Sequence, residues 1–436
     1  MKITRAEFKG NIIKKKIKIA VVGLGYVGLP LALEFAKKRI EVIGIDVDKD
    51  RISRLKKRVS YITDVSDREL RGVFSLGNFH VADEFSAVKK ADVVIICVPT
   101  PLKRKYHPNI SYIRQAVKSI SLHLKPMSLV VLESTTYPGT TDEVILPLLE
   151  QGGLKHNRDF YLCFSPERID PGNKDYPVYR IPKIIGGISR EATELGALVY
   201  RNIIERVVPV SSARVAEVVK LLENTFRLIN IGLIDELTMM AHKMNVDIWE
   251  VIHAASTKPF GFMPFYPGPG VGGHCIPKDP LYLYWKARHH GFKPKFIKLA
   301  SDIISRMPEY VVTRVEETLR QRGVALEKAR VLILGVTYKK DVLDLRKSPS
   351  LDVIDCLQKR KINFSYYDPL VPYLKWGHFN LTSVKLDAAT LKRFDCAVVL
   401  SDHSDVDYVL IRKNSRLIFD TRNVYKGIKD AKVSRI

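Results

Sequence analysis

The feature that most constrains the fold is a glycine-rich turn, GLGYVG, at residues 23 to 28. It follows a run rich in β-branched residues, KIKIAVVG (16–23), and precedes a helical pattern, PLALEFAKKR (30–39). A second strand-like run, EVIGID (41–46), ends in an acidic residue. A glycine turn between a strand and a helix, with an acid at the end of the next strand, is typical of a βαβ unit that binds a dinucleotide. We therefore predict such a unit near the start of the chain.

Each glycine of this turn has its own expected role. Gly23 permits the tight turn, Gly25 lets the backbone approach a pyrophosphate, and Gly28 allows the helix to pack closely on the sheet. The helix N-terminus supplies N–H donors and a positive dipole. Asp46 can bind the ribose hydroxyls and would repel a 2′-phosphate, which favours NAD over NADP. A turn without a ligand is the alternative. The further candidates for NAD contacts near this turn are Tyr26, Val27 and Arg51.

Two later strand ends add candidates for the nicotinamide side. CVPTP (97–101) and ESTTYPG (133–139) fall where strands of the same sheet should end, and such folds bind ligands at that edge. The candidates are Pro99, Thr100 and Thr135. Ordinary turn chemistry is the alternative, because Thr-Pro pairs are common in loops.

The rest of the chain continues the alternation of strand-like runs with helical patterns, which favours parallel sheets flanked by helices. From 211 to 245 apolar residues recur at helical spacing with no Gly or Pro until Gly232, so we expect a long helix or a broken pair. Strand candidates resume at Arg330. We infer an α/β protein whose two α/β domains, 1–211 and 306–436, are joined by a helical domain, 212–305.

Composition excludes several classes of protein. No apolar run reaches the roughly 20 residues of a membrane span, and the start lacks a secretory signal, so we expect a cytoplasmic protein without a membrane partner. The five cysteines lie far apart and form no zinc-ligand pattern, so no metal is expected. A net charge of +24 attracts anions, either nucleic acid or small phosphorylated ligands. No nucleic-acid-binding signature accompanies it, and we expect no nucleic-acid partner.

A single cysteine, Cys275, stands in the glycine-rich segment GPGVGGHCIPKDP (268–280). A buried structural cysteine needs no glycines, whereas a nucleophile needs room for a substrate carbon and donors for an oxyanion. Lys220 and Asn224 lie one helical turn apart, and a lysine beside the cysteine would favour the thiolate. A solvated helix surface is the alternative for this pair.

The ordered set of motifs resembles the nucleotide-sugar 6-dehydrogenases, the family that includes UDP-glucose dehydrogenase. The resemblance rests on GLGYVG, the threonine of EST, SPER with Glu167 and Arg168, the pair Lys220 and Asn224, GGHC followed by Asp279, and GVTYK ending at Lys339. It implies an NAD-binding domain, a central helical domain that forms a homodimer through its long helix, and a C-terminal Rossmann-like domain that binds UDP.

The resemblance also implies the chemistry. The C6 hydroxymethyl of a UDP-sugar would be oxidised to a carboxylate by two NAD in succession, through a thiohemiacetal and a thioester on Cys275. Lys220 and Asn224 would stabilise the oxyanions, Asp279 would handle the alcohol proton through water, and Glu167 with Thr135 would direct the hydrolytic water. The substrate-binding candidates are Glu167, Arg168, Lys220, Asn224, Lys258, Tyr266, Gly272, Lys339 and Arg422.

Details within the motifs narrow the substrate. Pro171 stands where UDP-glucose enzymes have a second glutamate, so no role of that glutamate is transferable. SPERIDPGN and the segment 255–270 resemble the branch that oxidises UDP-N-acetylhexosamines, most closely UDP-N-acetylglucosamine. UDP-N-acetylmannosamine, UDP-glucose and a non-catalytic NAD- or nucleic-acid-binding protein are the alternatives. Lys258 is expected either to reach the sugar nucleotide of a neighbouring subunit or to be merely solvated.

Overall fold

The computed structural model describes residues 3–62, 65–102, 107–169, 176–273 and 275–436. These residues form two compact units, one of residues 1–223 with 281–292 and one of residues 224–280 with 293–436. The three domain boundaries inferred from the sequence stay predictions.

The first unit contains an eight-stranded sheet with the order β3-β2-β1-β4-β5-β6-β7-β8. Strands β1 to β6 pair in parallel in the order typical of dinucleotide-binding folds. Strand β7 runs antiparallel to β6, and β8 pairs parallel with β7. The strands are β1 (Lys18–Val22), β2 (Glu41–Ile45), β3 (Phe79–Ala82), β4 (Val93–Ile96), β5 (Ser128–Leu132), β6 (Phe160–Phe164), β7 (Lys183–Gly187) and β8 (Val207–Pro209).

Helices cover both faces of this sheet because strand side chains alternate between the faces. Ile19 and Val21 belong to one core cluster, while Ala20 and Val22 belong to the other. The first cluster includes α1 (Arg5–Ile13), α2 (Gly28–Lys37), α3 (Lys49–Lys56), α4 (Asp67–Ser75) and α7 (Arg190–Tyr200). The second includes α5 (Ser111–Ser121), α6 (Leu146–Glu150) and the start of α8 (Ala213–Lys243). Short 3₁₀ turns lie at Phe85–Lys90 and Val178–Arg180, and a π turn lies at Thr141–Ile145.

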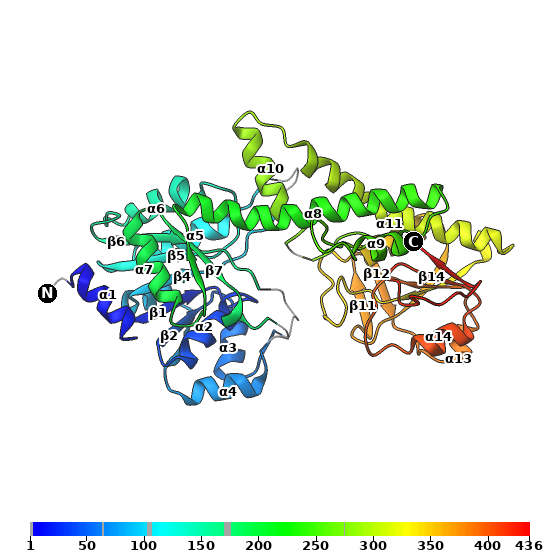
Figure 1. Ribbon diagram of the computed structural model, residues 1–436. Coiled ribbons are helices and arrows are strands. Elements are labelled where there is room, and N and C mark those ends of the chain that lie inside the picture. Colours follow the sequence, from blue (N-terminus) through cyan, green and yellow to red (C-terminus); the bar gives the residue numbers. More distant parts are fainter. Residues whose placement is uncertain (1–2, 63–64, 103–106, 170–175, 274) are drawn as a thin grey trace. The chain divides into compact units, whose positions relative to one another are not determined.

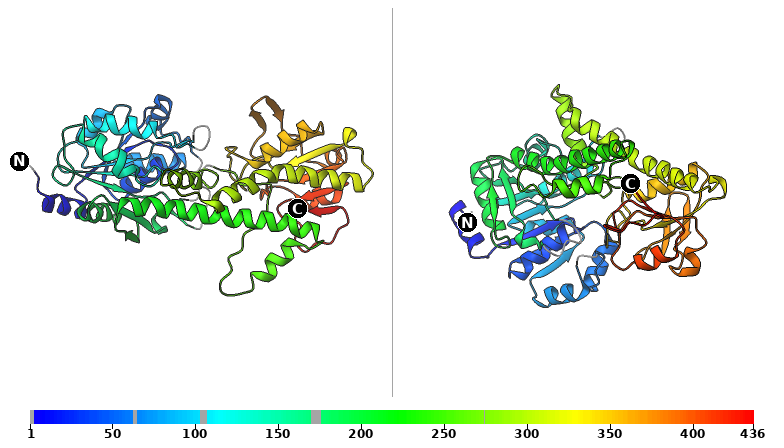
Figure 2. Two further views of the ribbon diagram at one scale, coloured as in Figure 1. Left: turned by 90° about the horizontal axis from the view of Figure 1, so that it is seen from above. Right: turned by 45° about the vertical axis from the view of Figure 1, so that its right-hand side comes forward.

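Helix α8 is unbroken over 31 residues, as the views in Figures 1 and 2 agree, so the expectation of one long helix holds over that of a broken pair. The division between the two units falls inside it, after Glu223. Gly232 lies within the unbroken helix at a close crossing with another helix. A Cβ at Gly232 would lie 2.9 Å from the Cβ of Ala300 on α11 (Lys295–Gln321), which leaves room only for glycine.

The second unit is built on a five-stranded parallel sheet with the order β10-β9-β13-β14-β15. Its strands are β9 (Arg330–Leu334), β10 (Asn363–Tyr367), β13 (Cys396–Val399), β14 (Ile418–Asp420) and β15 (Val433–Arg435), beside an antiparallel hairpin of β11 (Tyr373–Trp376) and β12 (Phe379–Thr382). Its further helices are α9 (Ile248–Ala255), α12 (Pro349–Lys359), α13 (Ala388–Leu391) and α14 (Tyr408–Asn414), with a 3₁₀ turn at Leu326–Lys328. Helix α10 (Asp279–His289) crosses the division between the units.

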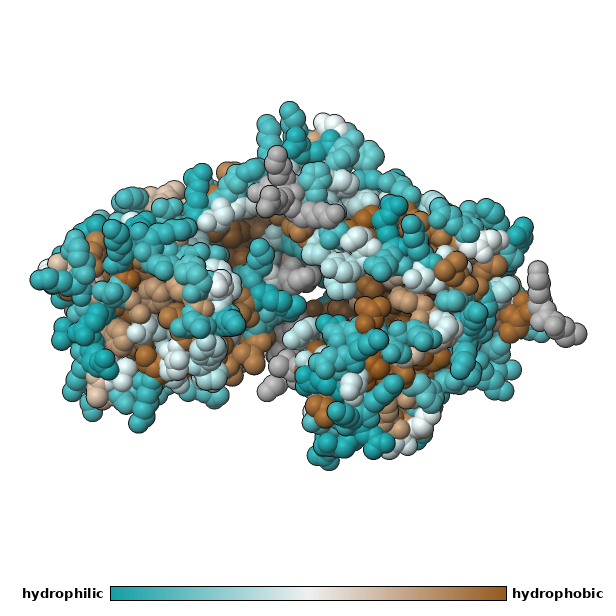
Figure 3. Space-filling model, turned by 180° about the vertical axis from the view of Figure 1, so that it is seen from behind, coloured by the Kyte–Doolittle hydropathy of each residue, from teal (hydrophilic) through white to brown (hydrophobic). Residues whose placement is uncertain are grey.

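The predicted α/β class is confirmed, and each quoted strand-like run contains a strand. The antiparallel strand β7 departs from the expectation of purely parallel sheets. Within the described ranges, no helix combines the length and the apolar character that crossing a membrane requires. On the face drawn in Figure 3 most surface residues are hydrophilic, and hydrophobic residues form smaller patches between them.

Candidate functional site

In the glycine turn of the first unit, packing requires glycine at Gly23 and Gly28 but not at Gly25. Gly23 has a φ of +93°, and a Cβ there would lie 2.6 Å from the carbonyl oxygen of Cys97. A Cβ at Gly28 would lie 1.8 Å from the carbonyl oxygen of Gly23. At Gly25, by contrast, a Cβ would meet nothing within 4 Å. The open space beside Gly25, just before the N-terminus of α2, fits the pyrophosphate of a dinucleotide.

Asp46 lies directly after β2 and is buried. Its carboxylate accepts hydrogen bonds from the N–H groups of Leu24 (2.8 Å) and Asp48 (3.0 Å) and pairs with the Arg51 guanidinium (3.2 Å). These contacts tie the glycine turn to the end of the second strand. Asp46 is thus both a candidate ribose ligand and a support of the turn. The other candidates at this turn are Tyr26, which is exposed, and Val27, which is the N-cap of α2.

The candidates for the nicotinamide side follow β4 and β5. Pro99 is exposed, Thr100 is buried, and the Thr100 carbonyl accepts a hydrogen bond from the Tyr282 hydroxyl. Thr135 is partly buried. The loop after it is held by Glu217 of α8, whose carboxylate accepts hydrogen bonds from the N–H groups of Gly139 and Thr141. Sequence reasoning missed Glu217, which stands among ordinary helix residues.

Glu167 and Arg168 follow β6 in the first unit. One oxygen of Glu167 accepts hydrogen bonds from the N–H groups of Arg168 (2.6 Å) and Ile169 (2.7 Å). The Arg168 guanidinium pairs with Glu223 at 2.7 Å and donates to the carbonyl of Pro182. Pro171 lies outside the described residues.

A buried ion cluster that sequence reasoning missed adjoins Glu167. Lys183, the first residue of β7, lies 3.0 Å from Glu167 and 3.1 Å from Glu133, which directly follows β5. Tyr200, at the end of α7, donates its hydroxyl hydrogen to Glu133. The quoted motif ESTTYPG contains Glu133, but only the antiparallel course of β7 brings Lys183 to it.

In the second unit the cysteine loop packs against the segment after β9. A Cβ at Gly272 would lie 2.5 Å from the Cβ of Tyr338, and one at Gly273 would lie 2.8 Å from its ring. The glycines before Cys275 therefore admit the Tyr338 side chain, a role that the sequence did not reveal. Cys275 itself is exposed, and its carbonyl accepts hydrogen bonds from the N–H groups of Lys278 (3.0 Å) and Asp279 (2.8 Å).

The same unit brings three sequence-predicted residues together, Cys275, Asp279 and Asn224. The Asn224 side-chain amide donates to the Asp279 carboxylate at 2.7 Å, and both residues are buried. The Lys278 ammonium lies 3.8 Å from the other carboxylate oxygen. Lys220, one turn before Asn224 on α8, is also buried, so a solvated helix surface does not describe this pair.

The remaining substrate candidates of the second unit differ from one another in their exposure and in the groups they contact. The Arg422 guanidinium donates to the Leu400 carbonyl at 2.8 Å, and a Cβ at Gly268 would lie 2.8 Å from it. Lys339 is partly buried. Tyr266 is exposed and stacks on Trp249 with 5.9 Å between the ring centres. Lys258 is exposed and its ammonium lies 5.1 Å from the centre of the Phe260 ring.

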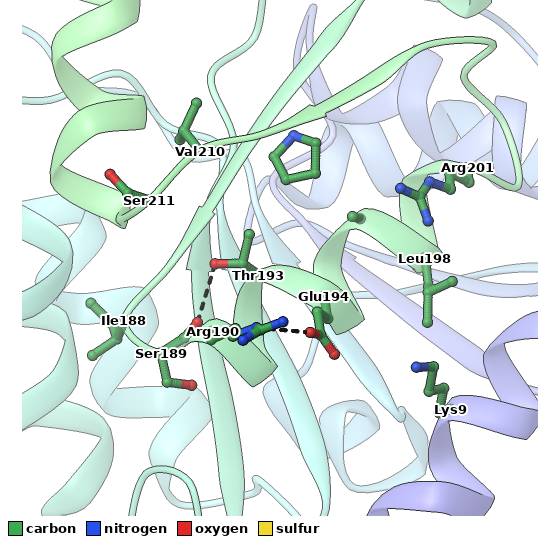
Figure 4. A pocket seen from close by; sticks show the side chains of 12 residues that line it. Lys9, Ile188, Ser189, Arg190, Thr193, Glu194, Leu198, Arg201, Val210 and Ser211 are labelled. Carbon is green, nitrogen blue, oxygen red and sulfur yellow. Dashed lines mark hydrogen bonds and ion pairs between the residues drawn. The ribbon is translucent and has the colours of Figure 1, made fainter.

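A pocket of about 620 Å³ opens in the first unit, and none of these candidates lines it (Figure 4). Its charged lining comes from Lys9 of α1, from Arg190 and Glu194 of α7, which pair at 3.3 Å, and from Arg201. The remaining lining side chains are small or apolar, among them Ile188, Leu198 and Val210.

Comparisons with known proteins match three parts of the chain to domains of one family. Models of the UDP-glucose/GDP-mannose dehydrogenase family match as its NAD binding domain (residues 17–204), its central domain (214–304) and its UDP binding domain (332–427). The chain belongs to this family. The predicted family and the NAD cofactor are thereby confirmed, as is the prediction of an NAD-dependent nucleotide-sugar 6-dehydrogenase with a UDP-sugar substrate.

Individual family members are similar over most of the chain. The UDP-N-acetyl-D-glucosamine 6-dehydrogenase of Pseudomonas aeruginosa is 41% identical over 82% of this chain and 84% of its own. The UDP-N-acetyl-D-mannosamine dehydrogenase of Pyrococcus horikoshii is 35% identical over 94% of this chain and 96% of its own. A solved structure of the UDP-D-ManNAc dehydrogenase from Pyrococcus horikoshii has a TM-score of 0.87 at 34% identity and covers 96% of this chain and 99% of that one.

Proposed function

We propose that this enzyme oxidises the C6 hydroxymethyl group of UDP-N-acetylglucosamine to a carboxylate, using two NAD in succession. The choice of sugar rests on identity. Two relatives named for UDP-N-acetyl-D-glucosamine, from Pseudomonas aeruginosa and Salmonella typhi, are 41% and 38% identical, whereas the Pyrococcus horikoshii relative named for UDP-N-acetyl-D-mannosamine is 35% identical. UDP-N-acetylmannosamine is the second candidate, because that relative matches 94% of the chain.

A panel of UDP-sugars tests the choice of substrate. NADH release is measured with UDP-N-acetylglucosamine, UDP-N-acetylmannosamine and UDP-glucose at equal concentrations. We expect the highest kcat/KM with UDP-N-acetylglucosamine and two NADH per sugar. A higher kcat/KM with UDP-N-acetylmannosamine would establish the second candidate instead, and no turnover with any of the three would refute both.

The proposed chemistry assigns a role to each candidate side chain. NAD, when bound, accepts a hydride in each of the two oxidations. Asp279 takes the proton of the alcohol through a water, while Lys220 and Asn224 stabilise oxyanions. The Cys275 thiolate adds to the aldehyde, and oxidation of the resulting thiohemiacetal gives a thioester.

Hydrolysis then completes the reaction. Water, directed by Thr135 and Glu167, attacks the thioester carbon, its proton passes to the Glu167 carboxylate, and the Cys275 thiolate leaves. The exposure of Cys275 and the burial of Asp279 with its Asn224 partner support these roles.

Substitution of the cysteine tests the covalent step. Cys275→Ser should bind NAD and UDP-sugar as the wild type does but form no carboxylate, because a serine hydroxyl is a weaker nucleophile than a thiolate at neutral pH. Cys356→Ser is the matched control, since Cys356 lies on α12 and should leave NADH release unchanged. NADH release at the wild-type rate from Cys275→Ser would exclude the thiohemiacetal route.

We further propose that the enzyme is a homodimer that associates through α8. Apolar side chains on this helix are exposed at helical spacing, which is typical of a covered interface. They are Val215, Val218, Leu222, Phe226, Leu233 and Met240. The exposed Lys258 is proposed to reach the sugar nucleotide of the neighbouring subunit.

A further inference from the structure

One buried ammonium bridges two carboxylates where strands of the first sheet end. The Lys183 Nζ lies 3.1 Å from Glu133 Oε2 and 3.0 Å from Glu167 Oε2. Strands β5 and β6 both end at this side of the sheet, and β7 begins there because it runs antiparallel to β6. Three residues that are distant in sequence therefore meet. Their side chains are 6% (Lys183), 0% (Glu133) and 12% (Glu167) exposed, so only Glu167 reaches toward the surface.

The two carboxylates differ in their other partners. Both Glu167 oxygens are held, Oε2 by Lys183 and Oε1 by the N–H groups of Arg168 and Ile169. Glu133 Oε1 instead accepts the Tyr200 hydroxyl. Two backbone N–H groups and an ammonium favour the charged form of a carboxylate more than one neutral hydroxyl does. The cluster is thus built so that Glu167 is the better-stabilised anion.

The charge balance of the cluster also makes Glu167 a better-stabilised anion than Glu133. Two carboxylates share one ammonium, so one excess negative charge would be buried if both were ionised. Burial is the main cause that raises the pKa of Glu133 to about 7, and Glu167 adds to it, while Lys183 and Tyr200 act against it. Burial also acts to raise the pKa of Glu167, but Lys183 and the two amides outweigh it, and that pKa falls below its ordinary value. Among the described residues, Cys97, which follows β4, is a further titratable group that interacts electrostatically with Glu133, Lys183 and Glu167.

We propose that Lys183 is a positioning residue that keeps the Glu167 carboxylate ionised and fixed in direction, while Glu133 is the partner that takes up a proton in its place. This inference rests on the proposed role of Glu167 in thioester hydrolysis. The hydrolytic water must lose a proton, and only an ionised Glu167 can accept it. Without the ammonium, the carboxylate would lose an ionic hydrogen bond and its preference for the charged form. The two oxidation steps precede hydrolysis and do not use this group.

The test separates hydrolysis from oxidation. Removal of Lys183 alone leaves Glu133 and Glu167 without their shared cation, which can unfold the chain, so the main variant is the double substitution Lys183→Met with Glu133→Gln. Mixed with NAD and UDP-N-acetylglucosamine, it should release a rapid burst of up to two NADH per site. Hydrolysis should then be about 100-fold slower, the range expected for a lost general base. The acyl adduct on Cys275 should accumulate and be visible by intact-protein mass spectrometry after acid quench.

Two readouts distinguish positioning from a merely structural role. The pH at which hydrolysis reaches half its maximal rate should move upward in the double variant, because the pKa of Glu167 rises, while KM for UDP-sugar stays within about twofold. Glu133→Gln alone, which keeps the ammonium, should hydrolyse like the wild type. Lys183→Arg, which keeps the charge, should recover at least about a tenth of wild-type hydrolysis.

Two results would contradict the positioning role of Lys183. An unshifted pH profile without an adduct in the double variant would overturn the positioning role, as would a loss in Lys183→Arg equal to that in the double variant. If instead Cys275→Ser turns over normally, the covalent route of the proposed function fails, whatever the Lys183 variants do.

Discussion

The three glycines of GLGYVG should respond differently to the same substitution. A methyl group at Gly25 meets nothing within 4 Å, and its φ is not in the left-handed region. A methyl group at Gly28 meets the Gly23 carbonyl oxygen at 1.8 Å and the Cys97 Cβ at 3.1 Å. We therefore expect Gly25→Ala to fold normally and bind NAD weakly, whereas Gly28→Ala should be destabilised even without NAD.

The magnitudes follow from these contacts. At Gly25 the methyl group would take the space of the pyrophosphate and cost one charge-assisted hydrogen bond, worth about 1.5–3 kcal/mol. At about 1.4 kcal/mol per factor of ten, the Kd for NAD should rise roughly 10- to 100-fold. At Gly28 the overpacking should cost about 1–3 kcal/mol. A unit of this size loses about 2–4 °C in Tm per kcal/mol, so the Tm should fall by about 2–12 °C.

Calorimetry without NAD and titration with NAD measure the two effects separately. Binding of UDP, which the family places on another domain, should be unchanged in Gly25→Ala and serves as the control. An NAD affinity within twofold of the wild type in Gly25→Ala, or a Tm loss equal to that of Gly28→Ala, would refute the assignment of the open space to the pyrophosphate.

Two further predictions concern the second unit and α8. Burial raises the pKa of Asp235 from 3.8 to about 8, against the lowering effects of the Gly268 N–H and Arg422. Between these pH values the folded chain therefore binds one more proton than the unfolded chain. The folded state loses stability as the pH rises through this range. The Tm advantage of Asp235→Asn should therefore grow from pH 4 to pH 8; a constant advantage would contradict the raised pKa. Leu222→Glu, on the exposed stripe of α8, should raise the dimer dissociation constant at least about tenfold in light scattering, since a charge enters an apolar interface. The matched control Val409→Glu, on a residue of α14 that is also apolar and exposed, should leave the mass unchanged; a Leu222→Glu protein of unaltered mass would remove α8 from the interface.

The sequence was informative where local pattern and fold coincide. Strand-like runs such as 16–23 and 41–46 became β1 and β2 because parallel strands buried on both faces are continuous apolar runs. Two features lay beyond this reasoning. Gly232 left open whether α8 was broken, and its close contact with Ala300, which explains why a glycine stands there, could not be read from the sequence. The direction of β7 decides that Lys183 meets Glu133 and Glu167, and strand direction has no local signature.

The two units also show which part of a glycine turn indicates a dinucleotide. Both sheets place a glycine of positive φ directly after one strand, Gly23 after β1 and Gly335 after β9. Both also place an acid directly after the neighbouring parallel strand, and each acid binds the turn. Asp46 accepts from the N–H of Leu24 at 2.8 Å, and Asp368 accepts from the N–H of Val336 at 2.7 Å.

The difference lies two residues after each of these glycines. In the first unit that position is Gly25, with open space beside it, whereas in the second it is Thr337, fully buried and hydrogen-bonded to His403 at 3.0 Å. A threonine side chain there takes up the room that a pyrophosphate would need against the backbone. The acid and the first glycine therefore support the turn in both sheets, and the second glycine is the residue that separates the NAD-binding sheet from its neighbour. This is why the substitution at Gly25, rather than one at Asp46, tests the cofactor site without disturbing the fold.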